Sequence, residues 1–359
     1  MSLHIINMAQ AIRDGLRDVA LKDPSVLFFA EGASDPTSVF GTLKGLGNEI
    51  GHDRIIEMPI SENALTGVAI GAALVGKRPV LSFHRVEFAL LAMEQIVNNA
   101  AKISYISEGR DSVPIVIRLV VGRGWGQGPN HSQSLESMFA HIPGLKVVMP
   151  TYPADAKGLI IGAVEDNNPV IFIENRWCHY VEGAVSDEYD SLPLDGPKIV
   201  REGRDFTVVA ASYMTLEAMM AADVLSSVGV ELEVLDIRVA RPFVYDKIKA
   251  SVSKTGQLLT VDMGWRQYGL GAEIVSEITE HCFSSLKGPP QRLGVADHPT
   301  PSSRGLIVNY YPDALDIARS VCRSLEFSES KMQTVLALFE DARQKNPIDT
   351  PHPAFKGPF

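Results

Sequence analysis

Glu62 lies at the start of a segment that is otherwise made of small and aliphatic residues, 59–76 (PISENALTGVAIGAALVG). This composition predicts a buried helix, which Ser61 can cap with its hydroxyl group. A carboxylate in the first turn is favoured by the helix dipole. Because the helix carries so little side-chain bulk, another backbone or a flat ligand can approach it closely. The segment therefore indicates either an acid presented to a ligand or a buried helix with a solvated acid at its start.

A glycine-rich loop, 122–131 (GRGWGQGPNH), ends at His131. Such a loop can fold tightly over a ligand, and a histidine can act as acid, base or donor near neutral pH. No Gly-Lys-Ser/Thr follows, so the loop is not a Walker loop, and it lacks the glycine spacing and acidic residue of a dinucleotide site. A surface loop with a capping histidine is the alternative.

The elements that must position these residues alternate between strand and helix, which predicts an α/β fold with mainly parallel sheets. Apolar runs without polar alternation are typical of strands buried on both faces. In the first half we expect helices at 6–22, 59–76, 89–107 and 153–165, and strands at 25–30, 79–83, 114–119, 145–150 and 169–173.

The composition changes after this alternation, because residues 182–203 combine glycine, proline and acids as linkers do. A second alternation follows, with strands predicted at 206–211, 231–237 and 257–262 and helices at 214–227, 243–253 and 270–281. We therefore predict two doubly wound domains, at 1–190 and 204–326, joined by a linker at 191–203. An extension at 327–359 contains an amphipathic helix at 327–346 and a proline-rich tail that is flexible or surface-bound.

Composition narrows the possible functions. The chain has 359 residues, of which 45% are hydrophobic and 21% are charged, and no apolar run is long enough to cross a membrane. A net charge of −10 argues against general nucleic-acid binding. No secretory signal is visible at the N-terminus. Cys178, Cys282 and Cys322 lie far apart without metal-ligand spacing, which fits a reducing compartment. We expect a cytoplasmic protein, or a matrix protein if it is a processed mitochondrial one.

Several short motifs occur in a consistent order along the chain. They are PISE (59–62), AMEQI (92–96), HSQ (131–133), PGLKVV (143–148), DAKGL (155–159), DNNP (166–169), RP (241–242) and GW (264–265). Over residues 4–325 the chain resembles the β subunit of the thiamine-diphosphate-dependent E1 component of 2-oxo acid dehydrogenases, of the pyruvate and branched-chain type. The resemblance implies a pyrimidine-binding domain followed by a transketolase C-terminal-type domain.

The same resemblance implies roles for individual residues. Glu62 matches the glutamate that hydrogen-bonds N1′ of the cofactor's aminopyrimidine, and Ile60, Phe83 and Val86 match positions around that ring. His131 matches the active-site histidine near the thiazolium and the substrate. A carboxyl group in the Glu62 role must hold or share a proton near neutral pH, and burial is what raises a carboxyl pKa.

Two ion sites follow from the resemblance. The family's monovalent-cation site, K⁺ in particular, uses main-chain carbonyls, which would fall on Ile115, Ala163, Asp166 and Asn168. The alternative for this segment is an ordinary turn shaped by Asp and Asn side chains. The family holds Mg²⁺ and the diphosphate through a Gly-Asp-Gly motif, which this sequence lacks. We therefore expect an α subunit to supply that half of the site in an α2β2 heterotetramer, with a lipoyl-bearing E2 receiving the acyl group.

Two departures from the family pattern leave the 2-oxo acid open. Val86 occupies a position that is usually aromatic, within the sequence His84-Arg85-Val86-Glu87, and the loop before His131 is partly like that of transketolases. The alternatives are the C-terminal subunit of a split transketolase-like enzyme and a non-catalytic structural subunit. A sugar-phosphate substrate would favour arginines clustered at the pocket, which sequence alone cannot locate.

The helix of the extension carries its apolar residues at near-helical spacing, which predicts packing on the parent chain rather than on a partner. These residues are Met332, Val335, Leu336 and Phe339.

Overall fold

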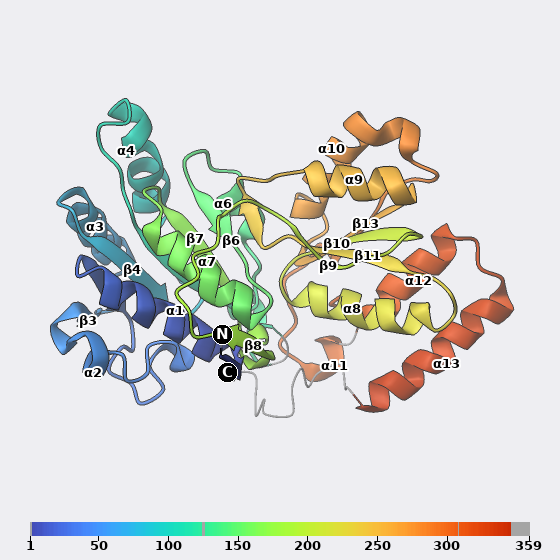
Figure 1. Cartoon of the computed structure of the whole chain (residues 1–359), viewed down its shortest axis with the longest axis horizontal. Coiled ribbons are helices and arrows are strands. Elements are labelled where there is room, and N and C mark those ends of the chain that lie inside the picture. Colours follow the sequence, from blue (N-terminus) through green and yellow to red (C-terminus); the bar gives the residue numbers. More distant parts are fainter. Residues whose placement is uncertain (1, 124–125, 308, 346–359) are drawn as a thin grey trace. The chain divides into compact units, whose positions relative to one another are not determined.

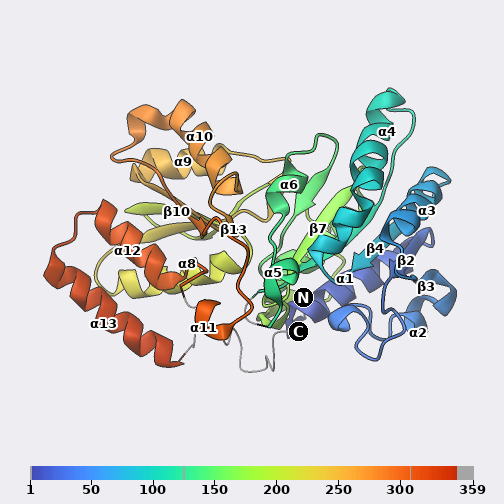
Figure 2. The same ribbon diagram turned by 180° about the vertical axis from the view of Figure 1, so that it is seen from behind.

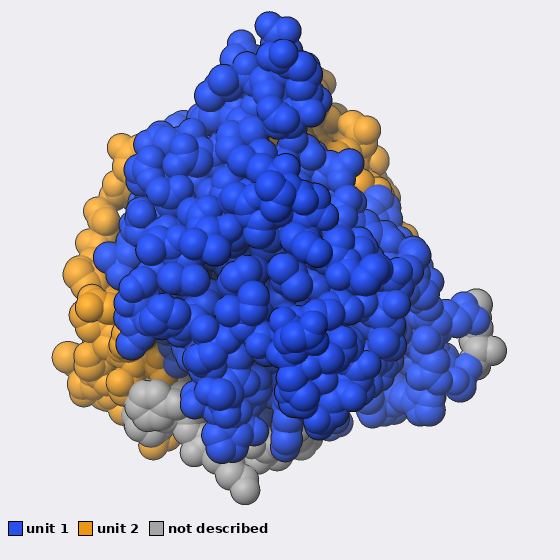
Figure 3. All heavy atoms as spheres, turned by 90° about the vertical axis from the view of Figure 1, so that its left-hand side faces the viewer, with its two compact units in different colours: residues 1–123, 138–194, 239–242 blue, residues 124–137, 195–238, 243–359 orange. Residues whose placement is uncertain are grey.

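The computed structural model (Figure 1) describes residues 2–123, 126–307 and 309–345, with only the backbone from residue 341 onward. The chain forms two compact units, which Figure 3 distinguishes by colour. Unit 1 comprises residues 1–123, 138–194 and 239–242, and unit 2 comprises residues 124–137, 195–238 and 243–359.

A seven-stranded sheet forms the centre of unit 1. Its neighbouring strands are all parallel except β12, which runs antiparallel to β6. The order across the sheet is β12 (Val239–Arg241), β6 (Lys146–Val148), β7 (Val170–Asn175), β5 (Val116–Val121), β4 (Arg78–Phe83), β2 (Val26–Ala30) and β3 (Ile55–Glu57). The strands β5 and β7 are buried along their whole length, as their apolar sequences predict.

The helices of unit 1 cover both faces of this sheet, as Figures 1 and 2 show from opposite sides. Helices α3 (Glu62–Leu74) and α4 (Ala101–Ile106) belong to crossovers that move across the sheet in one direction, and α7 (Pro153–Glu165) belongs to one that moves back. Right-handed crossovers therefore place α7 on the opposite face. There it packs against α1 (Met8–Lys22), whose start is fixed by a capping box.

The shorter elements of the first half complete this unit and its loops. They are β1 (Leu3–Asn7), η1 (Val39–Gly41), α2 (Gly47–Ile50), η2 (His52–Arg54), η3 (Val86–Ala92), η4 (Glu94–Ala100), α5 (Gly128–His131), α6 (Glu136–Ala140), η5 (Cys178–Tyr180) and β8 (Glu182–Ser186).

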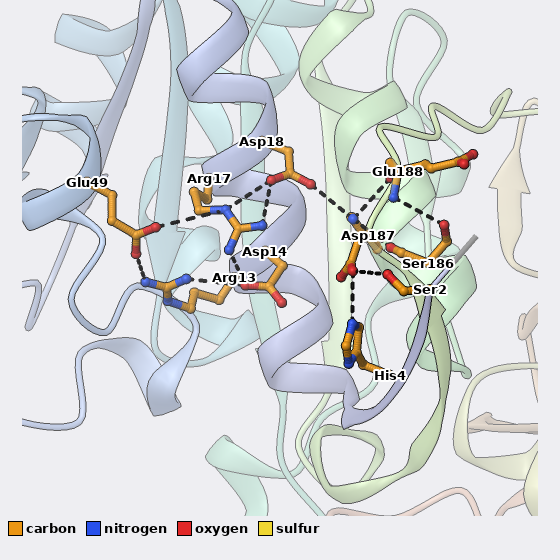
Figure 4. A network of polar contacts seen from close by, with 11 residues as sticks. Ser2, His4, Arg13, Asp14, Arg17, Asp18, Glu49, Ser186, Asp187 and Glu188 are labelled. Carbon is orange, nitrogen blue, oxygen red and sulfur yellow. Dashed lines mark hydrogen bonds and ion pairs between the residues drawn. The ribbon is translucent and has the colours of Figure 1, made fainter.

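A polar network ties α1 to its neighbours (Figure 4). Asp18 on α1 pairs with Arg17 at 2.7 Å and with the Lys157 ammonium of α7 at 3.0 Å. Lys157 is 4% exposed and also donates to the carbonyls of Ser186 and Glu188. Because this buried charge is paired and hydrogen-bonded, it holds α1, α7 and the chain after β8 together.

Unit 2 is built on a smaller sheet, in which β9 alone runs antiparallel to its neighbour. Helices α8 and α12 pack together on one face, and α9 and α10 on the other (Figures 1 and 2). The strand order is β14 (Gln291–Val295), β13 (Leu258–Trp265), β10 (Phe206–Ala210), β11 (Leu232–Asp236) and β9 (Lys198–Arg201). The helices are α8 (Tyr213–Ser226), α9 (Asp246–Thr255), α10 (Leu270–Cys282), η6 (Phe283–Ser285), α11 (Arg304–Ile307), α12 (Ala314–Ser324) and α13 (Glu329–Lys345).

The predicted α/β class with two doubly wound domains is confirmed. The last helix, α13, packs on α12 and α8, where Val335 and Phe339 are buried, so it lies on its own chain as predicted. The tail 347–359 lies outside the described residues. The three cysteines are buried, and none of them belongs to a disulfide. Within the described ranges, no helix is both long and apolar enough to span a bilayer.

Some local predictions were wrong. The helix expected from residue 6 begins at Met8, because 3–7 form β1 and pair antiparallel with β8. The helix expected at 89–107 is a succession of a 3-10 turn, a π-helix and a short α-helix. Ser61 occupies the N-cap position of α3, but its side chain makes no capping hydrogen bond, since its backbone (φ −157°, ψ 60°) departs from cap geometry. Strand β9 occupies part of the expected linker, and β12, β14 and α12 were not predicted.

Candidate active site

The carboxyl ends of the parallel strands of unit 1 form the candidate site. The chain leaves β2 toward β3 and leaves the adjacent β4 toward β5, in opposite directions across the sheet. Open α/β sheets bind ligands at such a reversal, outside the carboxyl ends of the strands. Glu31 directly follows β2, and His84 and Arg85 directly follow β4. Ionisable side chains are therefore concentrated at the point where the topology predicts a ligand.

Glu62 is brought to this edge by α3, where it is the first helical residue and is 5% exposed. Two residues earlier, the Ile60 side chain is 85% exposed. The predicted catalytic acid, Glu62, is thus buried, while the apolar side chain of Ile60 close to it in the sequence is exposed to solvent. This favours the reading of an acid presented to a ligand over that of a solvated acid at a helix start.

A second acid, Glu31, accompanies Glu62. It is 7% exposed, and its Oε1 atom has no hydrogen-bond partner among the described residues. Burial, together with the carboxylates of Glu62 and Glu57, raises the pKa of Glu31 to about 7. A carboxyl group that is half protonated at neutral pH therefore lies close to the predicted catalytic acid. Sequence reasoning missed Glu31, whose only signal is an acid directly after a buried strand.

Glu57, at the end of the adjacent strand β3, stabilises the loop at the same edge of the sheet. It accepts hydrogen bonds from the backbone amides of Gly32 at 2.8 Å and Ser34 at 2.7 Å. Burial alone would raise the pKa of Glu57, but these hydrogen bonds outweigh it and lower the pKa below its usual value. Glu57 therefore stays ionised and fixes the loop that follows Glu31.

The two other predicted cofactor-contact residues lie beneath this edge. Phe83 ends β4 and Val86 begins η3, and both side chains are completely buried within the chain. They fill the packing under the strand ends and expose no side-chain surface.

A basic cluster occupies the part of the edge formed by β4, β5 and β7. The Arg118 guanidinium on β5 makes two hydrogen bonds to the Glu174 carboxylate on β7, at 2.7 and 3.1 Å, and both side chains are at most 1% exposed. His179 Nε2 lies 2.8 Å from the same carboxylate. Burial alone would raise the pKa of Glu174, but Arg118 and His179 lower it to about 2. Arg85 and Arg176 extend this cluster.

The predicted catalytic histidine belongs to unit 2. His131 is half-buried at the end of α5, in a loop of which residues 124 and 125 lie outside the described part. The Gly126 amide donates to the Ser302 carbonyl at 3.0 Å, which ties the loop to unit 2. Since Glu62 lies in unit 1, the joint action of Glu62 and His131 stays a prediction.

Close to this loop, unit 2 contains a buried acid that was not predicted. Burial, together with the neighbouring Glu136, raises the pKa of Asp262 to about 8. Asp262 accepts hydrogen bonds from the Gly264 and Gly271 amides, at 3.0 and 3.3 Å. Two carboxyl groups therefore share a buried site beside the start of α10.

Two of the carbonyls predicted to hold a monovalent cation already accept hydrogen bonds near the turn that joins α7 to β7. The Ile115 carbonyl accepts from the Val170 amide at 2.9 Å, and the Asp166 carbonyl accepts from the Arg78 guanidinium at 3.0 Å. The Asp166 carboxylate accepts from the backbone and side-chain nitrogens of Asn168. The segment thus forms the Asp/Asn turn that was the alternative, with a guanidinium supplying positive charge.

Comparisons with known proteins place the chain in a family. Residues 4–178 match the family model "Transketolase, pyrimidine binding domain", and residues 197–317 match "Transketolase, C-terminal domain". The mitochondrial pyruvate dehydrogenase E1 component subunit β of mouse is 39% identical over 325 residues, which cover 89% of this chain and 90% of that protein. The β-2 subunit from rice is 38% identical over 323 residues, covering 89% and 86%. This chain belongs to the family of E1 β subunits.

The transketolase-like fold is also found in solved structures. One of them, described as "Split gene transketolase, inactive beta4 tetramer", has a TM-score of 0.73 and covers 89% of this chain and 98% of its own, at 23% identity. This likeness concerns the fold. The E1 β relationship rests on the higher identity to the pyruvate dehydrogenase subunits.

Proposed function

We propose that the chain is the β subunit of a thiamine-diphosphate-dependent 2-oxo acid dehydrogenase, which decarboxylates a 2-oxo acid and transfers the acyl group to lipoyl-E2. The observation that carries the proposal is the buried Glu62 at the sheet edge, in a chain that shares 38–39% identity with E1 β subunits over most of its length. When bound, thiamine diphosphate would supply the electron sink for decarboxylation.

Glu62 would hold the pyrimidine half of that cofactor. Its carboxyl group is buried at a helix start, as a hydrogen bond to a ring nitrogen requires, and the exposed Ile60 beside it offers an apolar contact. Glu31, with a pKa of about 7, can take up or release a proton next to Glu62 at neutral pH. Phe83 and Val86 support the site from beneath. His131, contributed by unit 2, would act near the substrate.

The diphosphate half would come from an α partner. The sequence has no Gly-Asp-Gly motif, and the described residues contain no cluster of three His, Cys, Asp or Glu side chains suited to a metal ion. Unit 1 also exposes large apolar side chains that a partner subunit would cover. They are Ile60, Val68, Val75, Tyr105 and Ile106, with exposed fractions of 85%, 55%, 80%, 88% and 72%.

The monovalent-cation site is part of this proposal. K⁺ would have to share the Asp166 carbonyl with the Arg78 guanidinium, alongside the carbonyls of Ile115, Ala163 and Asn168. If K⁺ binds there, the unfolding temperature of the full chain rises more with KCl than with NaCl at equal concentration. Equal curves in the two salts would remove K⁺ from the account. For the compartment, we propose the cytoplasm or the mitochondrial matrix; the rice and mouse relatives are named as mitochondrial proteins.

One observation favours a second candidate. The arginines Arg85, Arg118 and Arg176 come together at the sheet edge, which a sugar-phosphate substrate of a split transketolase-like enzyme would need. The identity to E1 β subunits favours the dehydrogenase, because the transketolase structure is only 23% identical.

Purification of the native complex tests the proposal. We expect the chain to co-purify with a subunit that carries Gly-Asp-Gly, and the complex with thiamine diphosphate and Mg²⁺ to decarboxylate a 2-oxo acid. A partner like the N-terminal half of a transketolase, with ketol-transfer activity, would support the second candidate instead. A chain that elutes alone and binds no thiamine diphosphate would refute both.

A further inference from the structure

Two arginines lie at the carboxyl edge of the unit 1 sheet without a carboxylate partner. Arg85 follows β4 and Arg176 follows β7, and they are 6% and 8% exposed. No carboxylate of the described residues lies within salt-bridge distance of either guanidinium. Buried arginines normally pair with an anion, so this arrangement calls for an explanation.

The aromatic ring of Phe40 brings the two guanidinium groups together. The Cζ atoms of Arg85 and Arg176 lie 5.1 and 4.7 Å from the centre of that ring. Phe40 belongs to a loop in which Ser38, Val39 and Phe40 all have positive φ, at 39°, 48° and 58°. Such backbone is costly for residues other than glycine and occurs most often at functional sites.

Most of the N–H groups of the two guanidiniums have no protein acceptor in the described structure. Arg176 donates to the Tyr180 hydroxyl at 2.7 Å and lies 3.4 Å from His179 Nδ1, while its buried Nε atom has no partner. Arg85 makes one long hydrogen bond, 3.3 Å, to the His84 carbonyl. The pair therefore has donors to offer a ligand.

Arg176 is held in place by the buried ion pair beneath it. His179 Nε2 lies 2.8 Å from the Glu174 carboxylate, which Arg118 keeps ionised. This contact makes Nε2 the protonated nitrogen of a neutral His179, so Nδ1 is free to accept from Arg176. A chain of contacts from Arg118 through Glu174 and His179 thus sets the orientation of Arg176 before any ligand arrives.

The charges around the pair do not balance. Three positive charges lie here, on Arg85, Arg118 and Arg176. The Glu174 carboxylate neutralises that of Arg118, whereas Glu87 acts on Arg85 only from beyond salt-bridge distance. Burial, together with the charge of Arg176, lowers the pKa of Arg85 to about 10, and Glu87 opposes the change. The two guanidiniums repel each other, and an added anion would relieve this repulsion.

We propose that Arg85 and Arg176 form an oxyanion-binding site for an anionic group that the substrate carries in addition to its 2-oxo carboxylate. This proposal rests on the proposed function. The 2-oxo carboxylate itself is a poor fit, because it loses its charge as CO₂ departs, and two guanidiniums would stabilise the ground state more than the transition state. A second anionic group keeps its charge throughout, so binding it there would select the substrate without opposing the reaction.

The shared chemistry is a planar or tetrahedral oxyanion, either a carboxylate or a phosphate ester, since the guanidinium fork matches both. The first test uses the isolated full chain with inorganic phosphate and with succinate, against chloride at equal ionic strength, and follows the unfolding temperature. We expect at least one of the two anions to raise it. In Arg85→Gln and Arg176→Gln the apparent affinity should fall on the order of tenfold to a hundredfold.

Arg204→Gln is the matched control, because it removes one positive charge from a side chain that is 75% exposed in unit 2. It should bind the anion as the unaltered chain does. The proposal is overturned if neither anion binds, or if Arg85→Gln and Arg176→Gln bind as tightly as the control. A preference for phosphate would indicate a phosphorylated substrate, and a preference for succinate a dicarboxylic one.

The second test uses the complex with its α partner. We compare kcat/KM for two substrates, a 2-oxo acid with a second anionic group and pyruvate. In Arg176→Gln the ratio of the first value to the second should fall about tenfold or more, mainly because KM for the doubly anionic substrate rises. An unchanged ratio would contradict substrate selection by this site. Failure of the proposed function is distinguishable, because then the unaltered complex decarboxylates no 2-oxo acid while the isolated chain still binds the anion.

Discussion

Replacing Glu31 by glutamine should stabilise the protein, and the gain should grow as the pH rises. The substitution keeps the size of the side chain but removes a carboxylate that is buried close to Glu62 and Glu57. Because the pKa of Glu31 is raised to about 7 from its ordinary value of 4.5, the folded state binds more protons than the unfolded state between these two values. Burial of the neutral carboxyl group does not reduce the free energy of unfolding below about pH 4.5. As the pH rises from there to about 7, ionisation of the buried group lowers the free energy of unfolding.

The size of the effect follows from the shift. A rise in pKa from 4.5 to about 7 lowers the free energy of unfolding by roughly 3 kcal/mol at pH 8, since each pKa unit corresponds to about 1.4 kcal/mol. At pH 5 the linkage relation gives a loss of about 1 kcal/mol. The advantage of Glu31→Gln over the unaltered chain should therefore increase by about 2 kcal/mol between pH 5 and pH 8. For a unit of this size that corresponds to roughly 4–8 °C in unfolding temperature.

Urea unfolding at pH 5, 6, 7 and 8 measures this difference directly. Glu182→Gln is the control, since it removes a carboxylate that is exposed on β8 of the same unit. A Glu31→Gln advantage that is equal at pH 5 and pH 8 would refute the reasoning. A Glu62→Gln substitution in the same chain should weaken the pH dependence, because the Glu62 charge contributes to the raised pKa of Glu31.

Two further substitutions test the packing of unit 1. Glu174→Gln should cost about 3–5 kcal/mol in urea unfolding, because it leaves the buried Arg118 without its counter-charge; a loss below about 1 kcal/mol would show that the pair is dispensable. Gly144→Ala should cost more than about 2 kcal/mol, because Gly144 has φ +99° and an added Cβ would lie 1.9 Å from the Ala101 carbonyl oxygen. Gly76→Ala, at φ +89° with no atom within 4 Å of the added carbon, is its control and should cost only about 1 kcal/mol; equal losses would contradict the clash.

The elements that follow from local patterns could be predicted from the sequence. The helix at 153–165 was predicted with its observed bounds, since Pro153 begins it and an apolar run continues it. Pairings between distant segments could not be predicted. Strand β12 comes from residues 239–241, which follow a strand of unit 2 in sequence and yet complete the unit 1 sheet. Likewise, Leu3–Asn7 pairs with a strand more than 170 residues later, inside a stretch with linker composition.

The site shows the same division. Glu62 was found because its motif is local, and its burial agrees with the expectation. Glu31 was missed, because its raised pKa arises from neighbours on other elements that the fold brings together. Arg85 and Arg176 each follow a strand in the sequence, but β5 separates their strands in the sheet, so only the strand order shows that they meet.

The most direct test of the account is the activity of Glu62→Gln in the complex with its α partner. We expect this variant to assemble and to bind thiamine diphosphate, while decarboxylation of the 2-oxo acid falls at least about a hundredfold. The Glu182→Gln complex should retain the activity of the unaltered enzyme. Full activity in Glu62→Gln, with assembly and cofactor binding verified, would contradict the role of Glu62 and with it the central claim.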